Sequence, residues 1–142
     1  MATADKTPRG RAEVATSPLP MKPPAAPVEV IDLDAEATQL RAQHAWQLHG
    51  QSAKTLVKHE HFRVVLIALK AGRRCQEHRA EESVSVQTLQ GRIKVHLASD
   101  EAIELGRGRV LALAPALAHD FEAAEDSTVL LTLAWTGHRP GP

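Results

Sequence analysis

The chain has 142 residues, which suggests one domain plus a tail, and its 17 basic and 17 acidic residues give a formal net charge of zero. This balance offers no electrostatic reason to expect nucleic acid or a membrane as a partner. The single cysteine, Cys75, excludes an intrachain disulfide framework. The longest apolar run, 110–118, is too short to span a bilayer, and no N-terminal run has the form of a signal peptide, so we expect a cytoplasmic protein.

The first third of the chain predicts a leader and then a helix. Residues 1–28 hold six of the nine prolines and offer little to bury, so we expect a disordered Pro/Ala-rich leader. In the segment 29–50, apolar residues recur at helical spacing, which predicts one short helix packed on the main body. Asp32 or Asp34 is expected to cap its start, and Gly50 is expected to mark its end.

The segment 51–136 consists of short apolar stretches separated by turn signals. Residues 62–69 (FRVVLIAL) are apolar at nearly every position, as expected for a strand covered on both faces. Residues 83–90 alternate, which places one face inward: Val84, Val86 and Thr88. Eight or nine such strands with no helix between them predict an antiparallel sandwich or barrel. The tail, 137–142, is expected to fray.

Two histidines are candidates for the barrel interior. His78 lies within 72–91, a stretch that predicts a hairpin with this histidine near the start of a strand. His119 ends the stretch 108–119 and shares a strand face with Phe121. Inward-facing imidazoles are able to bind a metal, to act as general acid and base near neutral pH, or to hydrogen-bond a polar ligand. The residues themselves do not choose among these roles, so the catalytic residues stay unknown.

The spacing of the glycines and histidines resembles that of the cupin superfamily, in particular its small single-domain members, over roughly residues 52–135. The first cupin motif, G-x5-H-x-H-x3-E-x6-G, is matched in register by Gly72, His78 and Gly91. The second motif, G-x5-P-x-G-x2-H-x3-N, is matched by Gly108 and His119. The resemblance implies an all-β cupin jelly-roll β-barrel (a double-stranded β-helix), here preceded by the short helix and the leader.

The resemblance also shows where this chain departs from the family. Cupins that hold a metal usually use both histidines and the glutamate of the first motif, together with the histidine of the second. Here Ala80 and Val84 stand at the second-histidine and glutamate positions, so only His78 and His119 remain of four ligands. A divalent metal such as Zn, Fe, Mn or Ni wants three or four ligands, so the standard set is incomplete.

Other side chains are candidates to complete such a set. Gln76 and Glu82 fall on the His78 face if residues 76–82 are extended, whereas Cys75 falls on the opposite face and is expected to be a packing residue. The histidines at 59 and 61 are two further candidates. A purely structural interpretation is also open: Glu82 lies in a solvated loop, and the two histidines lie in a polar turn between two strands.

Two functions follow from these residues and the resemblance. One is a small-ligand-binding or regulatory barrel with a degenerate metal site, whose apolar pocket is lined by Val84, Val86, Thr88 and Phe121. The alternative is a metal-dependent cupin enzyme, a dioxygenase, isomerase or decarboxylase of a small organic acid, with a rebuilt ligand set. We expect a small molecule as partner and a homodimer, in which the second apolar face of 62–69 is a candidate subunit surface.

Overall fold

The computed structural model describes residues 26–78 and 81–135. Within these ranges the chain forms two short helices and then nine strands, as the sequence predicted for the strand-rich part. The elements in chain order are α1 (Leu33–Ala42), α2 (His44–His49), β1 (Gln51–Lys58), β2 (Phe62–Leu69), β3 (Arg74–His78), β4 (Ser83–Gln90), β5 (Arg92–Leu97), β6 (Ala102–Gly106), β7 (Val110–Leu113), β8 (His119–Ala123) and β9 (Ser127–Ala134).

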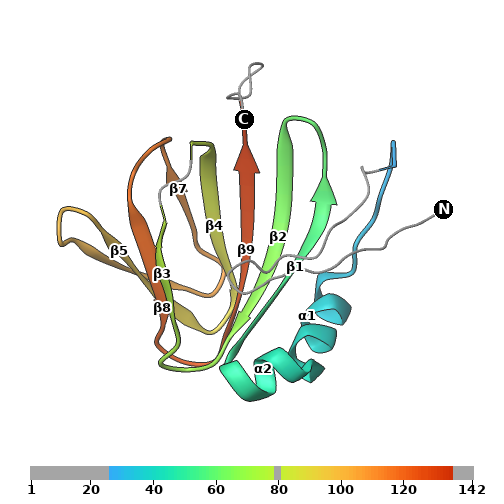
Figure 1. The fold of residues 1–142 in the computed structure, drawn as a ribbon, viewed down its shortest axis with the longest axis horizontal. Helices are drawn as coiled ribbons and strands as arrows, with labels where there is room; N and C mark the ends of the chain where they lie inside the picture. The colour runs from blue at the N-terminus through green and yellow to red at the C-terminus, as the bar shows by residue number, and fades with distance from the viewer. Residues whose placement is uncertain (1–25, 79–80, 136–142) are drawn as a thin grey trace.

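The strands form two antiparallel sheets that face each other (Figure 1). The five-stranded sheet has the order β1-β2-β9-β4-β7, and the four-stranded sheet has the order β3-β8-β5-β6. Neighbours along the chain often lie in opposite sheets, as in β3 and β4, which is the connectivity of a jelly roll. The predicted all-β barrel with a short N-terminal helical segment is therefore confirmed.

The main core lies between the two sheets and follows the period-two alternation of the strands. On β4 and β5 the inward positions are buried and the outward positions are not. Burial of each such aliphatic side chain stabilises the fold by roughly 1.5–3 kcal/mol. The core comprises Val65, Ile67, Leu69, Val84, Val86, Ile93, Val95, Leu105, Leu113, Phe121, Ala123 and Val129.

At one end of the barrel, which we call the closed end, the chain approaches itself tightly. The β4–β5 turn passes through Gly91 with φ of +83°, and a Cβ at this position would lie 2.8 Å from Ser127 Cα. Nearby, the buried Thr88 hydroxyl donates a hydrogen bond to Leu105 O at 3.0 Å. The opposite end, which we call the mouth, carries the β1–β2 turn and the start of β4.

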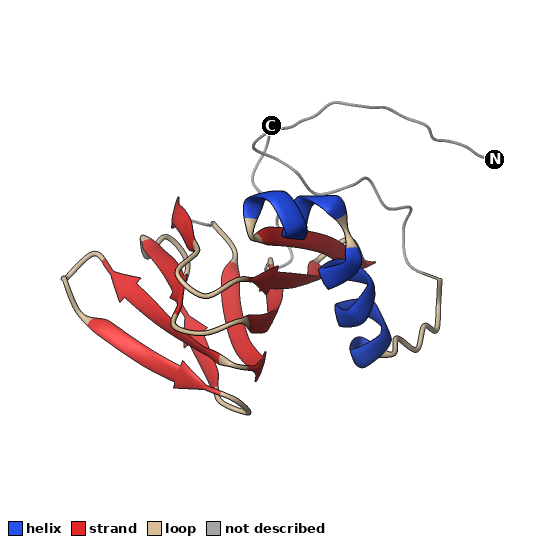
Figure 2. Cartoon of the chain, turned by 90° about the horizontal axis from the view of Figure 1, so that it is seen from below, coloured by secondary structure: helices blue, strands red, loops and turns tan. Residues whose placement is uncertain are grey.

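The helices pack on the outer face of the five-stranded sheet at β1 and β2 (Figure 2). Ala37 and Leu40 of α1 pack there in a second apolar cluster with Leu66 and Ala68 of β2. The prediction that residues 62–69 are covered on both faces is therefore confirmed for 65–69, whereas Phe62 is exposed and residues 63 and 64 are partly buried. Because the chain's own helix covers Leu66 and Ala68, we expect no subunit contact there, and the homodimer stays a prediction.

The predicted helix is resolved into two helices that meet at Gln43. This residue has the extended φ/ψ of −76°/151°, and its side-chain Oε1 accepts a hydrogen bond from Ser52 Oγ at 2.6 Å. Asp32 caps α1 by accepting from Ala35 N, and Gly50 ends α2 in the left-handed conformation, as predicted. The periodicity continues across Gln43, so spacing alone did not reveal the break.

The outermost segments fall largely outside the structural description. The predicted leader, 1–28, is described only from residue 26, and the predicted tail, 137–142, lies outside the described residues. Across the two described ranges, neither helix has the length and apolar character needed to cross a membrane.

The mouth of the barrel as candidate functional site

At the mouth, one residue from each strand of the five-stranded sheet joins a single cross-strand row. The row reads, from edge to edge, Lys58, Arg63, Leu133, Val84 and Leu113. Directly opposed residues of an antiparallel pair share a face. Since Leu133, Val84 and Leu113 pack in the main core, this row lies on the inner face of the sheet. We call it the mouth row.

The four-stranded sheet contributes His119 at the same end of the barrel. His119 begins β8 and is opposed by Leu97 of β5. Its side chain is buried at 3% exposure, and its Nδ1 lies 2.9 Å from Leu117 O, with a tilted ring contact to Phe121 at 5.9 Å between centroids. The predicted inward position of His119 is therefore confirmed.

His78 occupies a different place along its strand from the one predicted. It is the last residue of β3, not near the start of a strand, and the stretch 72–91 is not a hairpin because β3 and β4 belong to different sheets. Alternation reports which face a residue occupies but not which strand it pairs with. In register, His78 is opposed by His119; its side chain and that of Gln76 lie outside the description.

The predicted relation between Cys75 and His78 assumed an unbroken extended strand, which β3 does not have. Three residues separate these positions on β3, but their partners on β8, Phe121 and His119, are only two apart. This register shift removes the alternation on which the prediction of opposite faces, and of Gln76 sharing the His78 face, depended. Cys75 packs against the core as expected, and burial raises the pKa of its thiol to about 11.

Sequence reasoning missed Arg63, although its signal was present in the alternation of β2. Arg63 stands two residues before Val65, so it falls on the inner face. Its Nε is buried without a hydrogen-bond partner, and its Cζ lies 5.6 Å from the centroid of the Trp135 ring. Arg63 is the one charged residue in the otherwise apolar run FRVVLIAL.

The predicted pocket residues all lie on inner faces. Val84 is 4% exposed, Val86 and Thr88 are fully buried, and Phe121 is 5% exposed. Their burial agrees with a barrel core and with a pocket wall alike, so their role in binding stays a prediction. Glu82 lies in the bend before β4, where it is partly buried.

The other histidines and acids that the structure describes show no clustering suited to a metal. His59 and His61 are exposed in the β1–β2 turn, as predicted, where His59 stacks on Phe62. Within residues 26–78 and 81–135, no three side chains among His, Cys, Asp and Glu come together in a group able to hold a metal ion.

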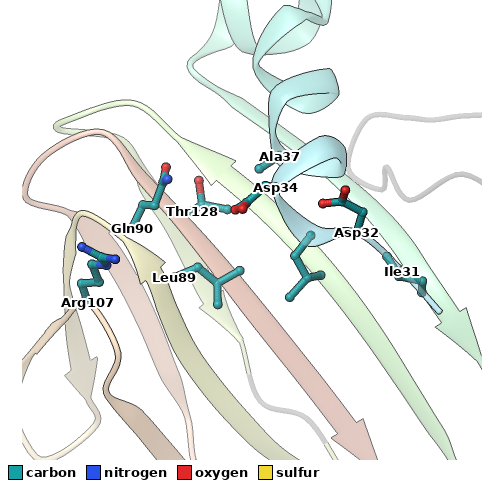
Figure 3. Close-up of a pocket in the computed structure, with 9 residues that line it drawn as sticks. Ile31, Asp32, Asp34, Ala37, Leu89, Gln90, Arg107 and Thr128 are labelled. Carbon is teal, nitrogen blue, oxygen red and sulfur yellow. The ribbon is translucent and has the colours of Figure 1, made fainter.

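A separate pocket lies outside the barrel, beneath the first turn of α1 (Figure 3). Its volume is about 600 Å³, and it was not predicted from the sequence. Asp32 and Asp34 of the helix face Gln90, Arg107 and Thr128 of the sheet and its turns across this space. Its lining is mixed, because apolar side chains such as Ile31 and Leu89 stand beside these polar ones, in contrast to the apolar interior of the barrel.

The outer face of the four-stranded sheet is charged. Arg74 binds Asp120 at 3.0 Å, and this hydrogen bond and charge raise the pKa of the Arg74 guanidinium. His96 Nε2 lies 3.1 Å from a carboxylate oxygen of Glu122. These pairs place charged groups of β3, β5 and β8 on the face opposite the core, as is typical of a surface.

Comparison with known proteins rests on structure alone. No protein-family model matches the chain, and no curated protein matches its sequence. A cupin superfamily protein from Desulfitobacterium hafniense is similar with a TM-score of 0.61 at 16% identity, covering 82% of this chain and 94% of the other. An RmlC-like cupin from Desulfovibrio desulfuricans gives 0.56 at 23% identity, covering 80% and 96%.

Similarity extends to an enzyme of greater length. Salicylate 1,2-dioxygenase from Pseudoaminobacter salicylatoxidans gives a TM-score of 0.69 at 15% identity, covering 80% of this chain but only 37% of that one. At such identities the similarity concerns the fold and not the activity. The two facing sheets, their jelly-roll connectivity and these structural neighbours together show that the chain has the fold of a small cupin domain.

Proposed function

We propose that this protein is a small-ligand-binding or regulatory barrel whose binding site is the mouth of the cupin fold. The observation that carries the proposal is His119, a buried polar side chain on an inner face that is otherwise largely aliphatic. An apolar pocket with a few converging polar groups is the usual form of a small-molecule site.

The proposal includes a degenerate metal site, because the described residues do not fit the standard cupin centre. At the position of the family's glutamate, Val84 is 4% exposed and packs in the core with Leu113 of the neighbouring strand. A hydrocarbon side chain there supplies no donor atom and leaves no room for a carboxylate without repacking. Two imidazoles alone hold a divalent ion only loosely.

A second candidate function is a metal-dependent enzyme on a small organic acid, with a rebuilt ligand set. The observation that favours it is the register of β3 and β8, in which His78 is opposed by His119. Opposed residues of an antiparallel pair have Cβ atoms about 5 Å apart, close enough for two imidazoles to share one ion. The metal content of the purified protein decides between the two functions.

The binding function is tested with His119→Ala and a matched control in the core. We expect the variant to bind no member of a panel of small apolar alcohols and acids in heteronuclear NMR titrations, while its spectrum stays that of a folded protein. Val129→Ala truncates a buried residue far from the mouth and should keep binding. If His119→Ala unfolds while His119→Gln folds and binds as the wild type does, His119 is a structural residue and the proposal fails.

A further inference from the structure

Arg63 is a cation on the inside of the barrel. Its cross-strand partners are Lys58 on β1 and Leu133 on β9. The next residue on the same face of β2 is Val65, which lies in the main core. Trp135, two residues beyond Leu133, approaches the guanidinium from the same side of the sheet. The guanidinium therefore enters the barrel at the mouth, at the level of the row that ends with Val84 and Leu113.

The guanidinium of Arg63 has hydrogen-bonding capacity that the described residues do not use. Its Nε is buried and has no acceptor, and across the described ranges no carboxylate forms an ion pair with it. Buried donors in native proteins are nearly always satisfied, so an orphaned one calls for an acceptor from outside the chain. An arginine whose Nε is buried beside apolar side chains is suited to an anion.

The surroundings of Arg63 restrict the kind of anion. The guanidinium fork matches a carboxylate or a phosphate, because both offer two oxygens in one plane. The rest of the mouth row is aliphatic at Leu133, Val84 and Leu113, and Leu97 faces it from the other sheet. A hydrocarbon body bound there gains from burial, whereas a fully hydrated inorganic anion does not.

We propose that Arg63 is the anion-binding residue of the mouth and that the ligand class is a small organic carboxylate with an apolar body. The carboxylate accepts from the guanidinium nitrogens of Arg63, and Lys58 adds positive charge from the adjacent position. The hydrocarbon part then lies along the aliphatic members of the mouth row. This inference rests on the proposed binding function, and it adds the chemical class of the ligand.

The test compares carboxylates with their neutral analogues. Hexanoate and benzoate are titrated into the full-length protein at pH 7, beside hexan-1-ol, benzyl alcohol and inorganic phosphate, with heteronuclear NMR shifts as the readout. We expect the two carboxylates to bind at least about tenfold more tightly than the alcohols or phosphate, because hydrogen bonds to a charged group are worth this much.

The variants assign the effect to one side chain. Arg63→Gln should raise the Kd of the carboxylates at least about tenfold and leave the Kd of the alcohols nearly unchanged. Arg63→Lys keeps the charge without the fork and should give an intermediate Kd. Arg109→Gln removes one exposed arginine near the closed end and should change neither the Kd of the carboxylates nor that of the alcohols. If Arg63→Gln fails to fold, Arg63→Lys carries the same comparison.

The outcomes separate this inference from the proposed function. If alcohols and carboxylates bind equally tightly, and if substitution of Arg63 leaves their Kd unchanged, the carboxylate inference is overturned and the binding function remains. Preference for phosphate would overturn the apolar body as a determinant. Absence of binding by all probes at tens of millimolar would overturn both proposals.

Discussion

His78 and His119, which lie 41 positions apart in the chain, stand directly opposite each other in the antiparallel ladder of β3 and β8. The ladder brings the two motif histidines to one end of the barrel, although neither strand is long. A register shift between Cys75 and His78 sets this opposition, and before the shift Cys75 is opposed by Phe121 and packs against the core. The following predictions test these arrangements.

The thiol of Cys75 should react slowly in the folded protein and make stability fall in alkaline solution. Burial raises its pKa from 9.0 to about 11, so little thiolate is present at pH 8. The unfolded chain releases this proton near pH 9 and the folded chain near pH 11. The stabilising contribution is therefore complete below about pH 9 and is lost as the pH rises toward 11, by on the order of 2 kcal/mol.

This prediction is checked by iodoacetamide labelling at pH 8 and by urea unfolding between pH 8 and 11. Cys75→Ala is the control, and it should show a shallower alkaline loss. Rapid labelling of the native wild type at the rate of a free thiol would contradict burial of Cys75.

Gly91 should tolerate substitution much less well than Gly108. Both glycines have positive φ, +83° and +84°, so alanine at either costs about 1–2 kcal/mol in backbone strain. At Gly91 the added methyl group also overlaps Asp126 O and Ser127, whereas at Gly108 it meets nothing within 4 Å. We expect Gly91→Ala to be more destabilising by at least about 2 kcal/mol in urea unfolding. Equal losses would mean that the closed end is looser than described.

Much of the fold was predictable because its signals are local. Alternation in 83–90 and 92–97 gave the inner faces, and the spacing of Gly72 and Gly108 from the two histidines, set against the cupin motifs, gave the architecture. Strand partners are determined by tertiary packing and not by alternation, so the region 72–91 was wrongly predicted to be a hairpin.

The candidate site was less predictable than the fold. His119 follows from the motif resemblance, but a register shift inside β3 leaves no mark in the sequence, so the faces of Cys75 and Gln76 relative to His78 were out of reach. Arg63 was readable in principle, as a charge at an inward position of an apolar strand. The proposed anion follows from its unpaired Nε, which is a property of the folded chain and not of the sequence.

The helix α1 should contribute to stability through one side chain above all. Leu40 is fully buried against Leu66 and Ala68 of β2. Leu40→Ala should lower the free energy of unfolding by about 2–5 kcal/mol, because it leaves a cavity between helix and sheet. Leu48→Ala, at a position 64% exposed on α2, is the control and should change it by less than about 0.5 kcal/mol. A loss for Leu40→Ala no larger than for the control would show that α1 is not firmly packed.

The predicted homodimer should not depend on the packing of α1 against β2. Because α1 covers the outer face of β2, we expect Leu66 and Ala68 to make no subunit contact, and Leu40→Ala to leave the association state unchanged. Sedimentation equilibrium at micromolar concentration should give twice the monomer mass of 15.4 kDa. A monomer mass over the whole concentration range would refute the dimer.

The most direct test of the account is the metal content of the untagged protein, measured by mass spectrometry beside the His78→Ala/His119→Ala double mutant. Because Val84 occupies the position of the family's carboxylate ligand, we expect far less than one equivalent of metal, even after incubation with Mn²⁺, Fe²⁺, Ni²⁺ and Zn²⁺. The double mutant should then match the wild type. Near-stoichiometric metal that is lost in the double mutant would contradict the degenerate site and place the metal-dependent enzyme first.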